Sequence, residues 1–514
     1  MSIDTIEDVS VPSDTRQKRW RWLRTAITLV IAVGLFLFAL QMRLNGLGFN
    51  IERDYDEGVY WQSLRAMQTG HTLYSQIFYS QPPFFLLSIY PSFIAFGGTL
   101  WAGRLGIALV SLFGILGAFL LGKALRGEVG AIAALALLVV DPIYLVESQV
   151  LQAEVPSAAF AMLTIGFAYL WWEHPEGRKG WMLAGLTGLT LALSILGKLL
   201  MVSTLVPLGL LLLARLVIVL RRPISERWQG LLPLIIAIAV AVIVSLLFLL
   251  PFVISAPKEF YHQVITFHTQ AAISFANSQV HNPGMVQNYL TMTLTLAATY
   301  GTIVSLIRRD WRVLPLLAWF AVTAILLIRQ VPVFQHHFIA FSPPLIALAI
   351  CGIGPFPLPR NARSTVTLLA SVMALVLIAI SIMGSVKQDR VYAHKEDAAA
   401  INGYSKYMKV LASDLDHNLQ PGGLVITDSQ FIAALGNRDT PPELVDTSGV
   451  RGRTGYLTGE QLLAVGQKEN VGAVLIFPAG RLRGTPDFNV FYTWVKANFH
   501  LAHKYKDQTE LWAR

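Results

Sequence analysis

Residues 25–44, TAITLVIAVGLFLFALQMRL, form an apolar run long enough to cross a bilayer as a single helix, which requires about 20 residues. Runs of this kind recur along the chain. They predict eleven membrane-spanning helices, at residues 25–44, 100–122, 128–146, 155–172, 181–197, 199–220, 229–254, 287–307, 313–328, 338–356 and 364–384. The predicted fold is therefore that of an α-helical polytopic membrane protein.

The composition excludes a water-soluble globular protein. Of the 514 residues, 54% are hydrophobic and 14% are charged, whereas a soluble domain carries about 25% charged residues. The net charge of +9 does not indicate nucleic-acid binding, because the cations cluster in short loops between apolar runs. The single cysteine, Cys351, excludes an internal disulfide, and no zinc-binding spacing occurs.

The lysines and arginines give the chain a direction across the membrane. Dense basic clusters precede the first run and follow the second, fourth, sixth, eighth and tenth, so they all fall on one side, which we take as cytoplasmic. The clusters contain Arg16, Lys18, Arg19, Arg21, Arg24, Lys123, Arg126, Arg178, Lys179, Arg215, Arg221, Arg222, Arg227, Arg308, Arg309, Arg312, Arg360 and Arg363. We therefore expect a cell-membrane protein with a cytoplasmic tail at 1–24, a membrane domain at 25–384 and a first outer loop at 45–99.

Two further segments complete the predicted organisation. Pro82–Gly98 is apolar but contains Pro91 and is barely long enough to span, so we expect a helix in the outer interface. Residues 385–514 have a mixed composition typical of a small α/β domain, which the charge pattern places outside the membrane. Its predicted strands lie at 423–428 and 472–477, and its helical patterns at 398–415 and 459–467.

Polar residues from separate parts of the chain fall on the predicted outer side. The first outer loop carries Asp54, Asp56 and Glu57, at the start of an amphipathic helix predicted at 56–68. Later outer segments contribute Glu147, Glu154, Lys198, His262, His268, His281, His336 and His337. Ionisable groups beside a membrane are costly to desolvate, so this set is a functional hypothesis by default.

These residue types suit one kind of chemistry. A carboxylate can act as general base toward an acceptor hydroxyl or amine, and cations can stabilise the charge on a departing phosphate. The combination fits glycosyl transfer from a lipid-phosphate sugar, whose polyprenyl tail would lie in the bilayer.

Simpler explanations exist for each residue. The first-loop acids could cap the helix that follows, and Glu154 could be an acid at a helix N-terminus. Lys198 could extend from a helix end toward the interface. The histidines could be ordinary interfacial or surface residues, so the shared side of the membrane is the main evidence for a site.

The motifs around these residues resemble those of a known superfamily. Asp56-Glu57-Gly58-Val59-Tyr60, followed by Gln81-Pro82-Pro83-Phe84, resembles the first-loop pattern of GT-C glycosyltransferases such as the protein O-mannosyltransferases and the lipid A aminoarabinose transferases (families 39 and 83). Arg104-Leu105 and Gly197-Lys198 match two further short motifs, and Glu154-Val155-Pro156 occupies the place of the second-loop acid. The tail also resembles the outer domain of many bacterial members.

The resemblance implies an inverting enzyme that takes a sugar from dolichyl or undecaprenyl phosphate. It implies that Asp56 is the lead catalytic carboxylate, with Glu57 and Glu154 as further catalytic acids. The candidates for binding the donor and its phosphate are Tyr60, Arg104, Lys198, His336 and His337, and additional site candidates are Asp54 and Gln81. The acceptor could be a protein, a lipid or a glycan.

The chain departs from the family pattern at three positions. Gln81 replaces the lysine before Pro-Pro, which removes one cation, and Glu154 replaces the usual aspartate. Some relatives bind a metal through an acid at the position that is Ser80 here, which disfavours a divalent metal site of that type and leaves no certain cofactor.

Two other classes of function compete with a transferase. A transporter or flippase of lipid-linked sugars would also have many spans and charged sites. However, the strong charges here fall in loops at one face, and no pair of broken helices indicates inverted repeats. The second alternative is a non-catalytic membrane scaffold that displays the tail domain.

Overall fold

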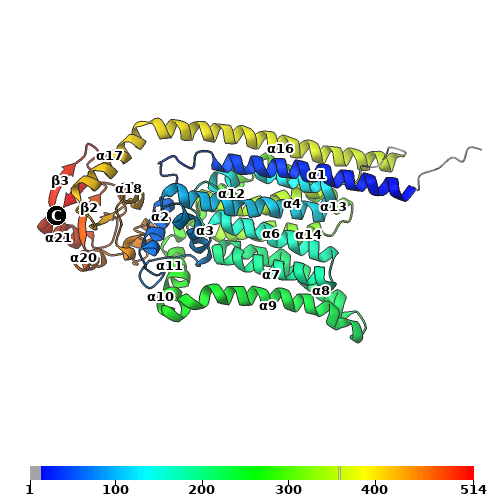
Figure 1. Cartoon of the computed structure of the whole chain (residues 1–514), viewed down its shortest axis with the longest axis horizontal. Helices are drawn as coiled ribbons and strands as arrows, with labels where there is room; N and C mark the ends of the chain where they lie inside the picture. Colours follow the sequence, from blue (N-terminus) through cyan, green and yellow to red (C-terminus); the bar gives the residue numbers. More distant parts are fainter. Residues whose placement is uncertain (1–12, 357, 359–360) are drawn as a thin grey trace, which may run out of the picture.

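The computed structural model describes residues 13–356, 358 and 361–514, and most of them form helices that run side by side (Figure 1). Residues 1–12 of the predicted tail and Arg360 of one basic cluster lie outside the described residues. Within the described chain, seven helices are long and apolar enough to cross a membrane, and a bent pair at 276–307 could make an eighth span. The protein is thus a polytopic helical membrane protein, as predicted, and the number of eleven spans stays a prediction.

The helices of the membrane part fall into long and short groups. The long ones are α1 (Ser13–Leu44), α4 (Leu100–Val139), α6 (Glu154–Glu173), α7 (Gly177–Gly197), α8 (Leu205–Leu220), α9 (Ile224–Ser255), α13 (Thr293–Ile307), α14 (Val313–Arg329) and α16 (Ala362–Ile401). The short ones are α2 (Tyr55–Gln68), α3 (Phe84–Ala95), α5 (Pro142–Glu147), η1 (Leu199–Thr204), α10 (Pro257–Tyr261), η2 (His262–Thr266), α11 (Phe267–Ser274), η3 (Ala276–His281), α12 (Asn282–Tyr289), η4 (Gln335–Phe341) and α15 (Ser342–Cys351).

Helix α4 contains a sharp reversal that separates two of the predicted spans, 100–122 and 128–146. Its backbone leaves the helical conformation at Arg126 and Gly127, where Gly127 has a φ of +64° that glycine adopts without strain. A Cβ added to Gly122 would lie 2.2 Å from the carbonyl oxygen of Gly130. These two residues would be about 12 Å apart in a straight helix, so the chain folds back at the break.

The first outer loop forms the two short helices α2 and α3. Helix α2 occupies the predicted position. Helix α3 has 12 residues and is therefore about 18 Å long, too short for a hydrocarbon core of about 30 Å. The ring of Tyr60 on α2 packs edge-on against Phe85 on α3, with 4.8 Å between the ring centroids.

The C-terminal part folds into a mixed sheet covered by helices. Its strands β1 (Leu424–Thr427), β2 (Val471–Ile476), β3 (His500–Lys504) and β4 (Glu510–Ala513) are ordered β1-β2-β4-β3. Strands β1 and β2 are parallel, whereas β4 pairs antiparallel with both β2 and β3. The helices are α17 (Gly403–Asn418), α18 (Gln430–Leu435), η5 (Pro442–Leu444), α19 (Gly449–Arg453), α20 (Gly459–Lys468) and α21 (Phe488–Asn498). The small α/β unit is present as expected.

This α/β unit packs directly on α2 at one end of the helix bundle (Figure 1). The Gln62 amide on α2 donates to the carbonyl of Arg438 at 2.8 Å, and Arg65 pairs with Asp439 at 2.5 Å. A Cβ on Gly58 would lie 2.5 Å from the backbone nitrogen of Phe431, so only glycine allows this approach. Helix α16 runs unbroken past the expected boundary at 385, and the division into domains remains a prediction.

Candidate active site

Glu154 and Lys198 form an ion pair at one end of the helix bundle. Glu154 is the first residue of α6 and is 1% exposed, and Lys198 directly follows the last residue of α7 and is 8% exposed. The Lys198 ammonium donates to Glu154 Oε1. The sequence predicts a shared side for these residues, and the structure brings them into direct contact.

The packing of α6 against α7 explains why these two ends meet. The two helices are antiparallel neighbours joined by residues 174–176, so the start of one lies beside the end of the other. Ser194 donates from its hydroxyl to the Ser157 carbonyl at 2.9 Å. A Cβ on Gly197 would lie 2.3 Å from Ser157 Oγ, so glycine at this position sets the close approach of the helices.

His336 and His337 on η4 complete a buried cluster around Glu154. Their Nε2 atoms lie 3.5 and 3.7 Å from Glu154 Oε1. The Nδ1 atom of His336 lies 3.5 Å from Asp54 Oδ2, which connects this cluster to the first outer loop. Burial raises the pKa of Asp54, but the hydrogen bond and charge of His336 outweigh it, so the pKa lies below its ordinary value.

Asp54 and Asp56 have different environments although they are two residues apart. Asp54 is the N-cap of α2, and its side chain accepts from the Asp56 backbone nitrogen at 2.9 Å. No described residue donates a hydrogen bond to the Asp56 carboxylate. Burial, together with the negative charge of Asp54, raises the pKa of Asp56 to about 7, although His336 and Lys198 act in the opposite direction. Asp56 is therefore a free carboxylate whose pKa suits a general base at neutral pH.

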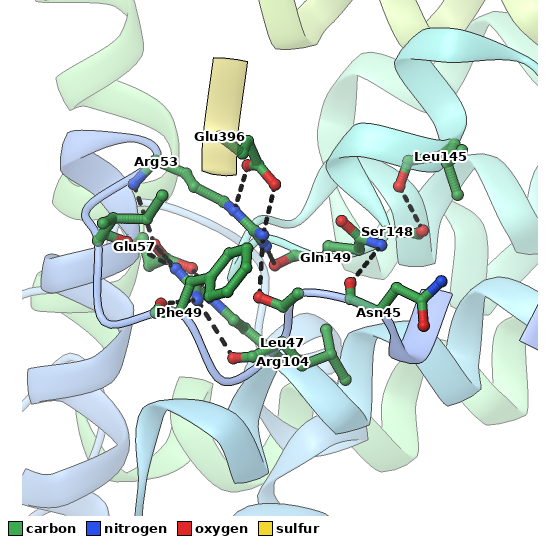
Figure 2. A network of polar contacts seen from close by, with 12 residues as sticks. Asn45, Leu47, Phe49, Arg53, Glu57, Arg104, Leu145, Ser148, Gln149 and Glu396 are labelled. Atoms are coloured by element: carbon green, nitrogen blue, oxygen red, sulfur yellow. Dashed lines mark hydrogen bonds and ion pairs between the residues drawn. The ribbon is translucent and has the colours of Figure 1, made fainter. Parts of the chain in front are cut away.

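Glu57 is sealed in a different network, which Figure 2 shows from close by. Arg104 donates to both Glu57 oxygens at 2.8 and 2.7 Å, and neither side chain is exposed. Arg104 also donates to the carbonyls of Leu47, Phe49 and Ile51. These bonds use the hydrogen-bonding capacity of both residues, so the structure places them behind the site as its support rather than in contact with substrates.

The remaining predicted residues lie around the first loop. Tyr60 is buried against Phe85, and Gln81 is largely buried with its carbonyl accepting from the Tyr74 hydroxyl at 2.8 Å. The backbone carbonyl of Ser80 lies 2.8 Å from His268 Nε2. The Ser80 side chain has no carboxylate, and His268 contacts the backbone of this residue.

The ligand atoms of Glu154, His336 and His337 lie within 4.8 Å of one another, as three ligands of one metal ion would. Carboxylate and imidazole are suitable ligands for several divalent metals. However, the Lys198 ammonium already donates to Glu154 at this point and would repel a dication. The donor set therefore fits a lysine-paired carboxylate better than a metal centre.

One further acid lies close enough to influence this cluster electrostatically. Glu147, at the end of α5, has a buried Oε2 atom without a hydrogen-bond partner. Burial raises its pKa to about 8, and the charge of His336 acts in the opposite direction. The sequence predicts that Glu147 lies on the same side as Glu154, but it does not distinguish the surroundings of these two acids.

Comparisons with known proteins show which family profile and which known folds the chain resembles. The sequence profile of the dolichyl-phosphate-mannose-protein mannosyltransferase family matches residues 80–250, which include Arg104, Glu154 and Lys198. The fold of the whole chain is similar to that of ArnT from Cupriavidus metallidurans bound to undecaprenyl phosphate, with a TM-score of 0.59 at 16% identity over 96% of this chain and 98% of that one. The chain therefore shares the fold of these glycosyltransferases, and its residues 80–250 match a glycosyltransferase family profile.

Comparisons with two further solved structures give the same fold. ArnT of the same organism in the apo state has a TM-score of 0.60 at 15% identity, over 97% of this chain and 98% of that one. The apo oligosaccharyltransferase of Archaeoglobus fulgidus has a TM-score of 0.51 at 14% identity, over 91% of this chain and 73% of that one. No curated protein sequence matches the chain. The fold-level similarity thus extends well beyond the segment that matches the family profile.

Proposed function

We propose that this protein is a GT-C glycosyltransferase that moves a sugar from a polyprenyl phosphate to an acceptor on the extracytoplasmic face of the cell membrane. The observation that carries the proposal is the free Asp56 carboxylate beside the cluster of Glu154, Lys198 and His336. A polyprenyl-phosphate donor is supported by the similarity to ArnT, which was crystallised with undecaprenyl phosphate.

Each residue then has a defined role in one displacement. Asp56 accepts the proton of the acceptor hydroxyl, whose oxygen forms a bond to the anomeric carbon of the donor sugar. The bond between that carbon and the phosphate oxygen breaks, and its electron pair stays on the leaving polyprenyl phosphate. Lys198 and His336 stabilise the negative charge that develops there. A single displacement of this kind inverts the anomeric centre.

The orientation in the membrane is supported by where the basic residues lie. Helix α6 begins at Glu154 in the site, and the residue Glu176, just beyond its other end, pairs with Arg222. At the α4 reversal, Arg126 pairs with Asp310 at 2.6 Å. Basic residues favour the cytoplasmic side, so the site at the opposite helix ends faces outward.

A transport function is disfavoured by the same geometry. The ionisable residues of the site lie at the first residue of α6 and just after the last residue of α7. Transporters place their substrate sites near the middle of the bilayer, between related halves. A site at the helix ends lies instead where a lipid carrier and an outer acceptor would meet.

The proposal is tested with purified protein in nanodiscs and a panel of radiolabelled polyprenyl-phosphate sugars. We expect one donor to be consumed with release of polyprenyl phosphate, and Asp56→Asn to abolish this while the protein keeps its melting temperature. Movement of intact donor across vesicles without cleavage would instead indicate a flippase.

A further inference from the structure

A cavity of about 500 Å³ lies between the first outer loop and the C-terminal α/β unit. Glu52 and Asp54 line it on the loop side, while Asp428 and Arg481 line it from the α/β unit. Its volume is within the range of about 300–1,000 Å³ for small-molecule sites. The family profile matches residues 80–250 and therefore includes none of the residues that line this cavity.

The cavity lies where α/β sheets usually bind ligands. Strands β1 and β2 are parallel, so their carboxyl ends meet at one edge of the sheet. Asp428 directly follows β1, and Phe477–Arg481 directly follows β2. Ligands of open α/β sheets bind outside the carboxyl ends of the strands, and both of these segments line the cavity.

The local backbone is shaped around the Asp428 carboxylate. Its oxygens accept from the backbone nitrogens of Phe477 and Leu482 at 3.2 and 3.3 Å. A Cβ on Gly480 would lie 1.6 Å from Asp428 Oδ2, so the loop can approach this acid only with glycine there. The arrangement holds a buried carboxyl group at the wall of the cavity.

The cavity and the candidate active site share Asp54 of the first loop. Asp54 both lines the cavity and faces His336 Nδ1 at 3.5 Å. Tyr55 also lines it, and the Arg481 guanidinium lies 3.7 Å from the centre of the Tyr55 ring. The next residue is Asp56, the proposed base, which does not itself line the cavity, so a bound ligand would reach it past Asp54 and Tyr55.

The lining favours a neutral, hydroxyl-bearing ligand over an anionic one. Four acids, Glu52, Asp54, Asp428 and Asp507, line the cavity with only two arginines. One of these, Arg53, is already paired with Glu396 at 2.6 Å. A phosphate-bearing head group would thus find one guanidinium in this lining without an ion-pair partner among the described residues, that of Arg481. Burial raises the pKa of Glu52 to about 8 and that of Asp428 to about 7, so these carboxyl groups can both donate hydrogen bonds to hydroxyl groups and accept them.

The Glu52 carboxyl and the outer edge of β1 each indicate what kind of ligand the cavity can bind. The Glu52 carboxyl makes no hydrogen bond with a described residue, so it is free to bond a ligand. Peptides often bind by adding a strand to a sheet edge, but the outer edge of β1 is already occupied where Val425 donates to the Asp439 carbonyl at 2.9 Å.

We propose that this cavity is the acceptor subsite and that its ligand is a carbohydrate, whose hydroxyl groups bond to Glu52 and Asp428 while its reacting hydroxyl faces Asp56. The inference rests on the proposed transferase function and names the acceptor class for it. Glu52 is then a specificity residue that contacts the acceptor and leaves donor binding unaffected.

The test compares Glu52→Leu with Glu460→Leu, a matched loss of an exposed carboxylate on α20. Each full-length protein receives the donor with one of three acceptors: a labelled mannotriose, a Ser/Thr peptide, or a phosphorylated glucosamine disaccharide lipid. The readouts are the KM for the acceptor, the KM for the donor, and the rate of donor hydrolysis without an acceptor. Glu52→Gln keeps the size and part of the hydrogen bonding, so it provides a second variant if Glu52→Leu folds poorly.

We expect Glu52→Leu to raise the KM for the saccharide about tenfold, the effect of losing one buried hydrogen bond, with unchanged donor KM and hydrolysis. Glu52→Gln should give a smaller rise, and Glu460→Leu none. An unchanged saccharide KM in both Glu52 variants, or wild-type transfer only to the peptide or the phosphorylated lipid, overturns the subsite. If the wild type neither transfers nor hydrolyses any donor, the proposed function itself fails.

Discussion

Arg104 donates two hydrogen bonds to Glu57, at 2.8 and 2.7 Å, and neither side chain is exposed to solvent. The pair joins α4 to the start of α2, and the same guanidinium binds three carbonyls of residues 47–51. It therefore fixes the loop that carries Asp54 and Asp56. The adjacent acids Asp56 and Glu57 consequently differ in function, because one is free and the other is part of the framework.

The first prediction separates these two acids experimentally. Glu57→Gln leaves the buried Arg104 charge without its partner, which typically destabilises a protein by about 3–5 kcal/mol. We expect a clear fall in melting temperature for Glu57→Gln and almost none for Asp56→Asn. Thermal unfolding in detergent measures both. Equal melting temperatures for wild type and Glu57→Gln would show that the pair does not support the loop.

The sequence could place these acids on one face of the membrane but could not assign their separate environments. Adjacent residues on an α-helix point about 100° apart, so Asp56 and Glu57 face different surroundings. The partner of Glu57 is 47 positions away in the chain, at Arg104. Such a contact depends on how α2 packs against α4, which local sequence patterns do not specify.

The fold also contains elements that local sequence patterns predict and elements that depend on tertiary contacts. The long apolar runs and the strands β1 and β2 are visible in the sequence because their residues are almost uniformly apolar. Strand β3 (His500–Lys504) is mostly exposed and β4 has four residues, so neither gives a strong pattern. Both form because β4 pairs with β2 and β3 pairs with β4, which is tertiary information.

A second prediction concerns the pH dependence of transfer. Burial and the charge of Asp54 raise the pKa of Asp56 to about 7. A general base acts only in its ionised form, so kcat/KM should be low at acidic pH, rise through about pH 7 and then level off. Asp56→Asn should reduce the rate by about 10²–10⁴-fold, the usual contribution of such a base. A profile that stays flat across this range argues against Asp56.

A third prediction concerns the phosphate of the donor. Arg104 is paired with Glu57, and Gln81 carries no charge, so Lys198, together with His336, supplies the positive charge beside the acids of the site. Lys198→Ala should raise the KM for the donor about tenfold or more, because hydrogen bonds to charged groups contribute about 1.5–3 kcal/mol. Lys198→Arg should recover part of the affinity. Steady-state kinetics with varied donor measures this, and a change confined to the acceptor KM contradicts the assignment.

A fourth prediction concerns metal dependence. The Lys198 ammonium donates to the same Glu154 oxygen that His336 and His337 approach. Because a dication would have to displace this ammonium, we expect EDTA to leave the transfer rate unchanged within about twofold. The readout is the initial rate after chelation and after adding back Mg²⁺, Mn²⁺ or Zn²⁺. Loss of activity that one metal restores would identify a metal centre at these three residues.

The last prediction tests how the helix packing positions the site. A Cβ on Gly197 would lie 2.3 Å from Ser157 Oγ. In Gly197→Ala either the Ser157 hydroxyl leaves its bond to the Ala153 carbonyl or the end of α7 moves away from α6, and we expect the second. Lys198 is the next residue, and its distance from Glu154 should increase with that shift. We expect Gly197→Ala to raise the donor KM, as Lys198→Ala does.

Gly209→Ala on α8, where an added methyl meets nothing within 4 Å, is the matched control and should leave the donor KM unchanged. If Ser157→Ala, which removes the opposing hydroxyl, restores donor binding to Gly197→Ala, the close contact between α6 and α7 is what places Lys198 beside Glu154. If Gly197→Ala alone binds the donor like wild type, the packing of α6 against α7 does not control the site.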